Sequence, residues 1–353
     1  MTDTHRQVVV GVDTHRDFHH GVVVDERGGE LGDARFDATT AGYTALVDWA
    51  EGFGQLVKAG VEGTGSYGAG LTAHLQALGI IVVEVTSPDR QQRRLRGKTD
   101  HLDALHAARA AASGQAQVVP KVRDSEVEMI RMVHTERRLV VKQNTESINA
   151  LKAAVVTAPA PIRDRLSQAR TNVALAKACV ALRVRASDGP LAEIAVAMLA
   201  RRARTWQDGH KQARLLLAEL GRLVAAVNPA LLAVHGVGPD SAAALLTCAG
   251  GNPDRIRDEA AFAMMTGVAP IPASSGQTHR YRLNRGGDRQ ANAALHRIIV
   301  VRLKSDPETR AYRDKTLARG KTRKDAHRLL KRYLARRLFT IIQNQPATLT
   351  AAA

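Results

Sequence analysis

Four acidic residues in the first third of the chain lie at the ends of predicted strands and in one predicted helix. Asp13 closes an apolar, strand-like run, and Glu62 closes a second run of the same kind. Asp100 and Asp103 lie three residues apart in a helical stretch, residues 98–105, so their side chains share one face of the helix. A fold that brings these elements together would gather four carboxylates in one small site.

Clustered carboxylates need a partner, because unpaired acids repel and one of them normally takes up a proton. A divalent cation removes that repulsion, since Mg2+ and Mn2+ prefer oxygen ligands and a pair of them can activate a nucleophile and stabilise the leaving oxygen of a phosphodiester. Single Asp and Glu side chains are usually solvated surface. The joint placement nevertheless predicts that Asp13, Glu62, Asp100 and Asp103 bind Mg2+ or Mn2+.

The elements around these acids follow one order. Strand signals cover Val8–Val12, His20–Val24, Glu30–Phe36, Leu56–Val61 and Ile80–Val85, and helix signals cover Ala41–Phe53, Ala69–Leu78 and the stretch with the Asp pair. The order βββαβαβα is that of a ribonuclease H fold, in which the first and fourth strands are neighbours. We therefore expect Asp13 and Glu62 to lie side by side.

The basic residues are concentrated in the last two thirds of the chain. In total 51 Lys and Arg stand against 34 Asp and Glu, a formal charge of +17. Residues 1–115 hold 11 basic and 15 acidic side chains (net −4), residues 116–228 hold 19 and 10 (net +9), and residues 229–353 hold 21 and 9 (net +12). This distribution predicts a nucleic acid as the partner.

Other compositional features argue against a membrane. Aromatic residues make up 3% of the chain, too few for an aromatic interfacial anchor, and no run approaches the roughly 18 apolar residues of a membrane-spanning helix. The first residues lead directly into a strand without a secretion signal. Cys179 and Cys248 are isolated in apolar helical runs, which favours buried thiols over a disulfide. We expect a soluble, cytoplasmic protein.

We divide the chain into a metal-binding domain (1–118), a helical arm (119–228), a C-terminal domain (229–345) and a short tail (346–353). Apolar residues in the arm recur at helical spacing, after a predicted capping box from Ser125 to Glu128. Its helices should end near Pro159 and Pro161 and again at residues 187–190. Such long helices either mediate oligomerisation or nucleic-acid binding, or simply pack as a bundle.

The C-terminal domain opens with a glycine turn before a helix. Gly236 and Gly238 resemble a helix-hairpin-helix turn, whose backbone N–H groups suit phosphate, although the same pattern occurs in plain connections. A closing basic helix, Thr322 to Ile342, should face the core on one side and phosphate on the other. Its apolar residues are Leu329, Leu330, Tyr333, Leu334, Leu338 and Ile341.

A second glycine motif, residues 63–68, matches G-x-G-x-x-G, and Glu84 follows about 20 residues later, as in dinucleotide-binding proteins. Three strands precede the motif, no third βα repeat follows, and residues 90–96 are strongly basic instead. We therefore interpret the glycines as a loop that lets a DNA backbone approach the metal site, where Ser66 or Tyr67 could contact it.

A serine pair, Ser274 and Ser275, precedes Gly276 and a basic segment that contains Arg280, Arg282 and Arg285. Such a loop either binds phosphate or supplies a nucleophile that the guanidinium groups assist. Local chemistry favours binding, because spacing fixes no base beside the serines; His279 is only a candidate.

The sequence resembles bacterial insertion-sequence transposases of the DEDD type, the insertion-sequence one-ten family. The Lys-Thr-Asp-x-x-Asp-Ala element that begins at Lys98 is the most specific match. The matching segments are Gly11–His15, Val61–Gly65, Gly97–Ala104, His235–Pro239 and Ser274–Gly276 with its basic tail.

This resemblance implies a RuvC-like N-terminal domain, a coiled-coil arm and a mostly helical transposase domain. It also implies an oligomer, a dimer or a tetramer, that acts on double-stranded DNA and is guided by a structured RNA from the same element. The four acids would be the metal ligands. Ser275 would be the nucleophile that forms a phosphoserine link to DNA, with Ser274 as the neighbouring alternative. The family is usually more basic just after the serine than residues 277–279 are here.

We therefore predict a site-specific DNA recombinase of a mobile element, with Lys98, Arg280, Arg282 and Arg285 contacting phosphates. The low aromatic content argues against recognition by base stacking. One alternative is a metal-dependent nuclease like a Holliday-junction resolvase, in which Ser275 only binds. An alternative of another class is a non-catalytic nucleic-acid-binding protein.

Overall fold

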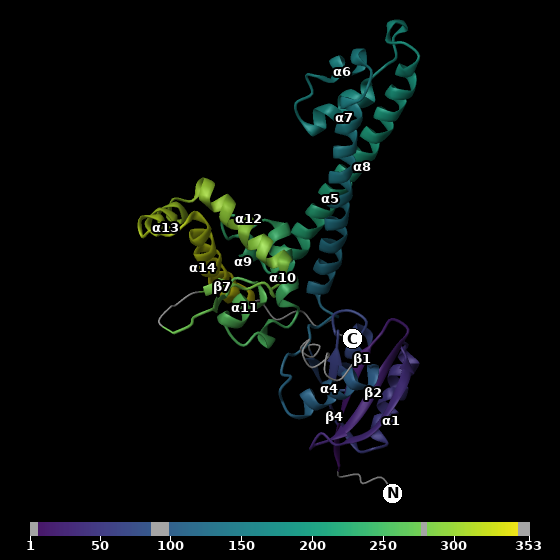
Figure 1. The fold of residues 1–353 in the computed structure, drawn as a ribbon, viewed down its shortest axis with the longest axis vertical. Helices are drawn as coiled ribbons and strands as arrows, with labels where there is room; N and C mark the ends of the chain where they lie inside the picture. Colours follow the sequence, from purple (N-terminus) through teal and green to yellow (C-terminus); the bar gives the residue numbers. More distant parts are fainter. Residues whose placement is uncertain (1–5, 86–98, 277–280, 345–353) are drawn as a thin grey trace. The chain divides into compact units, whose positions relative to one another are not determined.

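The computed structural model describes residues 6–85, 99–276 and 281–344 (Figure 1). These residues form two compact units. The sheet unit comprises Met1–Ser125 and Gly250–Arg257, and the helical unit comprises Glu126–Ala249 and Asp258–Ala353. The three-domain division made from the sequence stays a prediction. Lys98, His279 and Arg280 lie outside the described residues.

The sheet unit is built on a five-stranded mixed sheet with the order β3-β2-β1-β4-β5. Its strands are β1 (Gln7–Thr14), β2 (Phe18–Asp25), β3 (Glu30–Asp37), β4 (Gln55–Glu62) and β5 (Ile81–Val85). β1 pairs antiparallel with β2 and parallel with β4. The predicted adjacency of the first and fourth strands is confirmed. The antiparallel half of the sheet excludes the doubly wound parallel sheet that a dinucleotide-binding unit requires.

Helices cover both faces of this sheet. On one face, α1 (Thr40–Glu51) and α2 (Ala69–Ala77) enclose a core around Val10 and Val12. On the other face lies α4 (Asp100–Ala112), which packs through alanines against a second core layer that contains Val9. The sheet is therefore the middle layer of three, and this confirms the α/β part of the predicted fold class.

The backbone of α4 lies directly on the sheet at two glycines. A Cβ atom added to Gly11 would lie 2.0 Å from the backbone nitrogen of Ala108 and 2.1 Å from the backbone oxygen of Ala104. A Cβ atom on Gly60 would lie 2.4 Å from the backbone oxygen of Ala107. Any larger residue at either position would push α4 away, so the two glycines set the height of the helix above the sheet.

The helical unit begins with two long helices, α5 (Glu126–Val156) and α8 (Leu191–Val227), which run side by side in opposite directions (Figure 1). The short helices α6 (Ala160–Leu166) and α7 (Asn172–Ala181) complete a core around Trp206. The predicted break at the prolines is confirmed. The predicted capping box is wrong, because the buried Ser125 Oγ has no hydrogen-bond partner.

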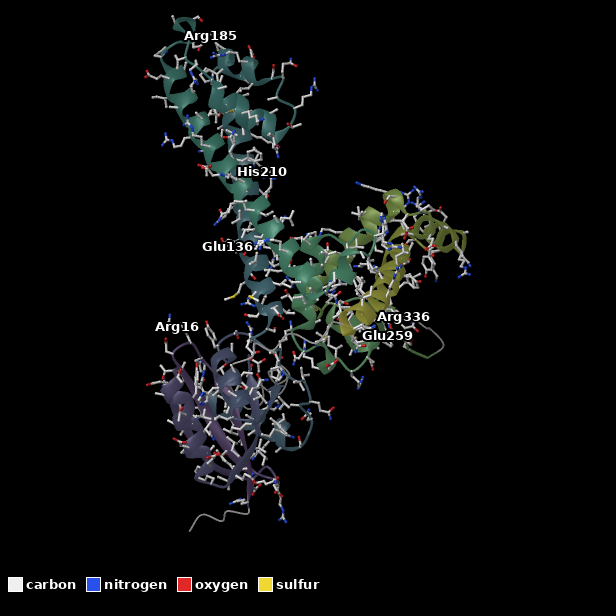
Figure 2. All side chains as sticks on the ribbon, turned by 180° about the vertical axis from the view of Figure 1, so that it is seen from behind. Arg16, Glu136, Arg185, His210, Glu259 and Arg336 are labelled. Atoms are coloured by element: carbon white, nitrogen blue, oxygen red, sulfur yellow. The ribbon has the colours of Figure 1, made fainter. Side chains whose placement is uncertain are left out.

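The rest of the helical unit is mostly α-helix. It contains α9 (Pro229–Leu232), α10 (Pro239–Ala249), α11 (Glu259–Met265), the hairpin β6 (Pro270–Pro272) and β7 (Tyr281–Leu283), α12 (Arg289–Ser305), α13 (Pro307–Ala318) and α14 (Arg323–Gln343). Arg336 of α14 bonds Glu259 at the start of α11 at 3.0 Å (Figure 2). Hydrogen bonds from Arg332 and Arg336 lower the pKa of Glu259 to about 2. Two short 3-10 turns, Ala186–Asp188 and Pro253–Arg255, complete the described elements.

Two sequence expectations about buried residues have different outcomes. Cys179 and Cys248 are both buried thiols that form no disulfide, as expected. In α14 the predicted apolar face is only partly buried, because Leu329 and Tyr333 are exposed.

In the described ranges, no helix combines the length and the hydropathy needed to cross a bilayer.

We predict that Gly11→Ala destabilises the packing of α4. The new methyl group collides with helix backbone, which no rotamer change can relieve, and overpacking of this kind costs about 1–3 kcal/mol. Native-state hydrogen exchange of the α4 amides measures the effect. Gly21→Ala in β2 is the matched control, since its Cβ would make only ordinary contact, 3.5 Å from Trp49. Equal loss of protection in both variants would contradict the close approach.

Candidate metal centre and serine hairpin

Asp13 and Glu62 lie on the face of the sheet that α4 covers. Val12 of β1 pairs with Val61 of β4, so each acid directly follows a paired residue on adjacent parallel strands. Side chains alternate along a strand, and the glycines two positions earlier both point into the backbone of α4. The hydroxyl of Thr14 donates to the backbone oxygen of Glu62 at 2.8 Å and ties the two strand ends together.

Asp100 and Asp103 occupy the first turn of α4. The helix begins at Asp100, later than the predicted stretch, because Thr99 adopts extended backbone angles and its hydroxyl accepts a hydrogen bond from the N–H of Leu102. Threonine at this capping position satisfies an otherwise unpaired backbone donor. Acidic residues in a first turn also interact favourably with the helix dipole. Asp103 is buried, whereas Asp100 is half-exposed.

The electrostatics of Asp13 show that these acids converge. Asp13 is only 7% exposed, and burial raises the pKa of its carboxyl group above the ordinary value. The charges of Asp103 and Asp100 raise that pKa further, and His15 opposes them. Three of the four predicted acids therefore lie close enough to affect one another. Glu62 shares their face of the sheet through its position on β4.

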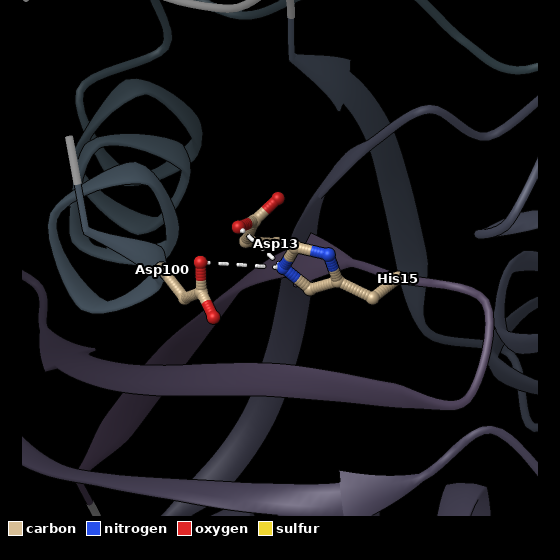
Figure 3. Close-up of side chains that lie close together, drawn as sticks. All are labelled: Asp13, His15 and Asp100. Carbon is tan, nitrogen blue, oxygen red and sulfur yellow. Dashed lines mark hydrogen bonds and ion pairs between the residues drawn. The ribbon is translucent and has the colours of Figure 1, made fainter.

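His15 is a member of this site that the sequence did not predict. Its Nε2 lies 3.1 Å from Oδ2 of Asp13 and 3.4 Å from Oδ1 of Asp100 (Figure 3). Its ring stacks on Phe18, with 4.6 Å between the ring centroids. One ligand atom each from Asp13, His15 and Asp100 lies within 4.8 Å of the others, a spacing that a metal ion can bridge. The only sequence signal was a histidine two residues after the strand acid.

The residues fit a divalent cation. The carboxylates of Asp103 and Asp100, which raise the pKa of buried Asp13, form the repulsive arrangement that a cation relieves. Carboxylate oxygens suit Mg2+ and Mn2+, and the imidazole adds a nitrogen ligand that Mn2+ accepts more readily than Mg2+ does.

The predicted serines lie on the β6–β7 hairpin of the helical unit. Ser274 and Ser275 follow β6 after one residue, Ala273, and both are exposed. Arg282 lies on the partner strand, where it pairs with Ile271, and Arg285 follows that strand. Both arginines are exposed. The described part of the hairpin thus carries both serines and two of the predicted phosphate-binding arginines.

The base of this hairpin is anchored by residues that the sequence did not single out. Asn292 of α12 donates to the backbone oxygens of Thr266 at 2.8 Å and Gly267 at 3.1 Å. Lys331 of α14 donates to the side-chain oxygen of Asn292 at 2.8 Å, and desolvation lowers the pKa of this lysine. The backbone φ of Gly267 is +69°. A Cβ atom added to Gly287 would lie 2.1 Å from the backbone nitrogen of Gly267, so the two glycines are in close contact.

The predicted glycine turn of the C-terminal region precedes α10, as expected. Gly236 has a φ of +84° and packs on α12, which accounts for glycine at this position. Gly238 faces open space. In the first turn of α10, Asp240 bonds Arg137, and its Oδ2 lies 2.8 Å from Arg297. Phosphate binding by this turn stays a prediction.

Asp13→Asn is expected to distinguish the cost of carboxylate repulsion from the gain of metal binding, both measured as changes in melting temperature. In EDTA at neutral pH it should raise the melting temperature, because the amide carries no charge to bury. The raised pKa makes the ionised form of Asp13 costly in the fold, so this cost develops as pH rises above about 4 and is complete above the raised value. The gain from Asn should therefore vanish below about pH 4.

With MnCl2 present, the wild-type protein should gain melting temperature and Asp13→Asn should gain little. Asp17→Asn is the control, because that exposed carboxylate lies between β1 and β2 and pairs with its neighbour Arg16. Equal stabilisation of wild type and Asp13→Asn by Mn2+ would refute the metal centre.

Comparison with known families agrees with this geometry. Residues 10–158 match the DEDD transposase family of IS110 elements, and residues 228–314 match the transposase family of IS116, IS110 and IS902 elements. An uncharacterized 43.6 kDa protein of insertion element IS110 from Streptomyces coelicolor is 34% identical over 138 residues, which cover 38% of this chain. The match spans about a third (34%) of that relative's length. Over these two segments the chain is therefore similar to the transposase families of IS110 elements.

Proposed function

We propose that the protein is the DNA transposase of a mobile element, which cuts and rejoins double-stranded DNA by phosphoryl transfer. The observation that carries this proposal is the convergence of Asp13 with Asp100 and Asp103 on one face of a ribonuclease-H-like sheet. The two matched families support it. The net charges of +9 and +12 on the later segments suit a polyanionic partner.

Asp13, Glu62, Asp100 and Asp103 would hold Mg2+ or Mn2+. Four carboxylates carry a charge of −4, which two divalent cations balance. Such ions polarise a scissile phosphate and stabilise its leaving oxygen. Nε2 of His15, which lies 3.1 Å from Asp13 and 3.4 Å from Asp100, would add a nitrogen ligand at the edge of the site.

Ser275 is the proposed nucleophile, with Ser274 as the neighbouring alternative. Its Oγ would form a bond to phosphorus, the bond from phosphorus to the leaving sugar oxygen would break, and the hydroxyl proton would pass to solvent. Arg282 of β7 and Arg285, which follows that strand, are exposed and would neutralise the phosphate, together with Lys98 and Arg280. Asn292 and Lys331 would position the hairpin without contacting the DNA.

The partners follow from the same proposal. A structured RNA of the same element would supply sequence choice, because aromatic residues, at 3%, are too few for recognition by base stacking. The paired α5 and α8 would serve a homo-oligomer, a dimer or a tetramer, that holds two DNA partners.

One alternative is favoured by a specific finding. The family that matches residues 10–158 is named for its DEDD acids, which support metal chemistry without any serine. A metal-dependent nuclease of the junction-resolvase kind would use the same four acids, and Ser275 would only bind phosphate. A non-catalytic nucleic-acid-binding protein would need neither the four acids nor Ser275.

Trapping distinguishes these functions. With labelled DNA that carries the element ends and Mg2+, wild type and Ser274→Ala should form a covalent protein–DNA adduct, whereas Ser275→Ala should form none. Denaturing electrophoresis after proteolysis shows whether the label stays on a peptide. Full cleavage by Ser275→Ala would establish the metal-only nuclease. DNA binding without cleavage or adduct, unchanged by Asp13→Asn and by EDTA, would leave only the binding protein.

Asn292→Leu is expected to lower strand exchange at least about tenfold, because the hairpin base loses two hydrogen bonds of about 1 kcal/mol each. The Mn2+-induced gain in melting temperature should be unchanged, since the acids lie in the other unit. Gln290→Ala in the same helix is the control. Wild-type exchange rates in Asn292→Leu would exclude a positioning role for this residue.

A further inference from the structure

A second group of potential ligands lies beside the acid site, on the α4 face of the sheet. Nε2 of His101 lies 2.7 Å from Oε1 of Glu30, and Nε2 of His20 lies 3.0 Å from Oδ2 of Asp33. One ligand atom each from Glu30, Asp33 and His101 lies within 4.8 Å of the others. These residues come from β3 and the first turn of α4 and have no part in the proposed strand exchange.

A β-bulge brings the two acids of β3 to the same face. Val23 pairs with Gly32 but Val24 pairs with Glu30, so Leu31 is an extra residue in the strand. In a regular strand Glu30 and Asp33, three residues apart, would point to opposite faces. The bulge reverses this alternation, as bulges do where a side chain must be redirected.

The redirected acids face α4. Glu30 pairs with Val24, and Asp33 pairs with Val22, and paired residues point to the same side of an antiparallel sheet. Val22 and Val24 both pack in the core beneath α4. Asp33 therefore lies on the face of the sheet that is covered by α4, the helix that contains His101.

The group is separate from the acid site but adjoins it. His20 pairs with Asp13 across β1 and β2, and His101 directly follows Asp100 in the helix. The two sites are therefore on neighbouring strands of the sheet, and their ligands in α4 are consecutive residues.

We propose that Glu30, Asp33 and His101 bind a first-row transition-metal cation, Zn2+ in preference to Mg2+, and that His20 orients Asp33. Imidazole with two carboxylates is a Zn2+ ligand set, whereas Mg2+ prefers oxygen alone. Two carboxylates balance the charge of the cation. Ligand atoms around tetrahedral Zn2+ are about 3.4 Å apart, so the widest pair needs to close by at most about 1.4 Å, and the His101–Glu30 pair needs to open by about 0.7 Å. A water molecule or a phosphate oxygen would complete the coordination.

The bound cation would fasten the first turn of α4 to β3, an edge strand of the sheet. Asp100 and Asp103 belong to the same helix end, so the tether would hold two of the four acids in position. This proposal concerns cation binding alone and does not require that the protein exchange DNA strands.

Isothermal titration calorimetry with ZnCl2 tests the site on the full chain, with saturating MgCl2 to occupy the acid site. Wild type should bind Zn2+ at a site that Asp13→Asn retains, and His101→Asn and Asp33→Asn should each weaken binding at that site at least about tenfold. Asp37→Asn, at an exposed carboxylate of the same strand, is the matched control and should bind like wild type. Asp13→Asn should also keep the Zn2+ site while it loses the Mn2+-induced gain in melting temperature.

The other outcomes overturn the proposal. If Zn2+ binds weakly and no variant changes its affinity, the cation binds to scattered surface histidines. If no Zn2+ binds, the His101–Glu30 and His20–Asp33 ion pairs only protect an edge strand from pairing with another chain. Loss of Zn2+ binding in Asp13→Asn alone would place the cation in the acid site. Circular dichroism of each variant confirms folding, and the two variants at different elements keep the test decisive if one fails to fold.

Discussion

The contact of the α4 backbone with Gly11 and Gly60 is the constraint on which the acid site depends. It lets a helix lie close enough to the sheet for its first turn to reach Asp13. Holding like charges together has a cost, about 1.4 kcal/mol for each unit by which a pKa is raised. Burial of one valine contributes about 1.5–3 kcal/mol. The valine and alanine layers on the two faces of the sheet can therefore offset the repulsion.

The elements that could be predicted are those whose signal is local or follows from strand order. Alternating apolar runs indicated the five strands, and proline indicated where α5 ends. The adjacency of Asp13 and Glu62 needed one further step, because the βββαβαβα order implies which strands are neighbours. Thr99 shows the limit of this approach, since the helix was predicted to include a residue that instead caps it.

The remaining features depend on tertiary packing, which spacing does not encode. The extra residue at Leu31 changes the face to which Glu30 points, and no local pattern marked it as a bulge. Asn292 matters because backbone carbonyls 25 and 26 residues earlier in the chain approach its amide group. His15 matters because Asp100, 85 positions later, approaches its ring.

Charge links the acid site to the rest of the chain. The acids lie in the one segment with a net negative charge, −4, and a phosphodiester would be repelled from four ionised carboxylates. In the proposed function two divalent cations would balance those charges, so the site would accept a phosphate only when it is loaded with metal. The segments with net charges of +9 and +12 would bind the DNA backbone with or without metal. If the protein acts as proposed, binding and cleavage should therefore respond differently to chelation, because only cleavage would need the cations that the carboxylates hold.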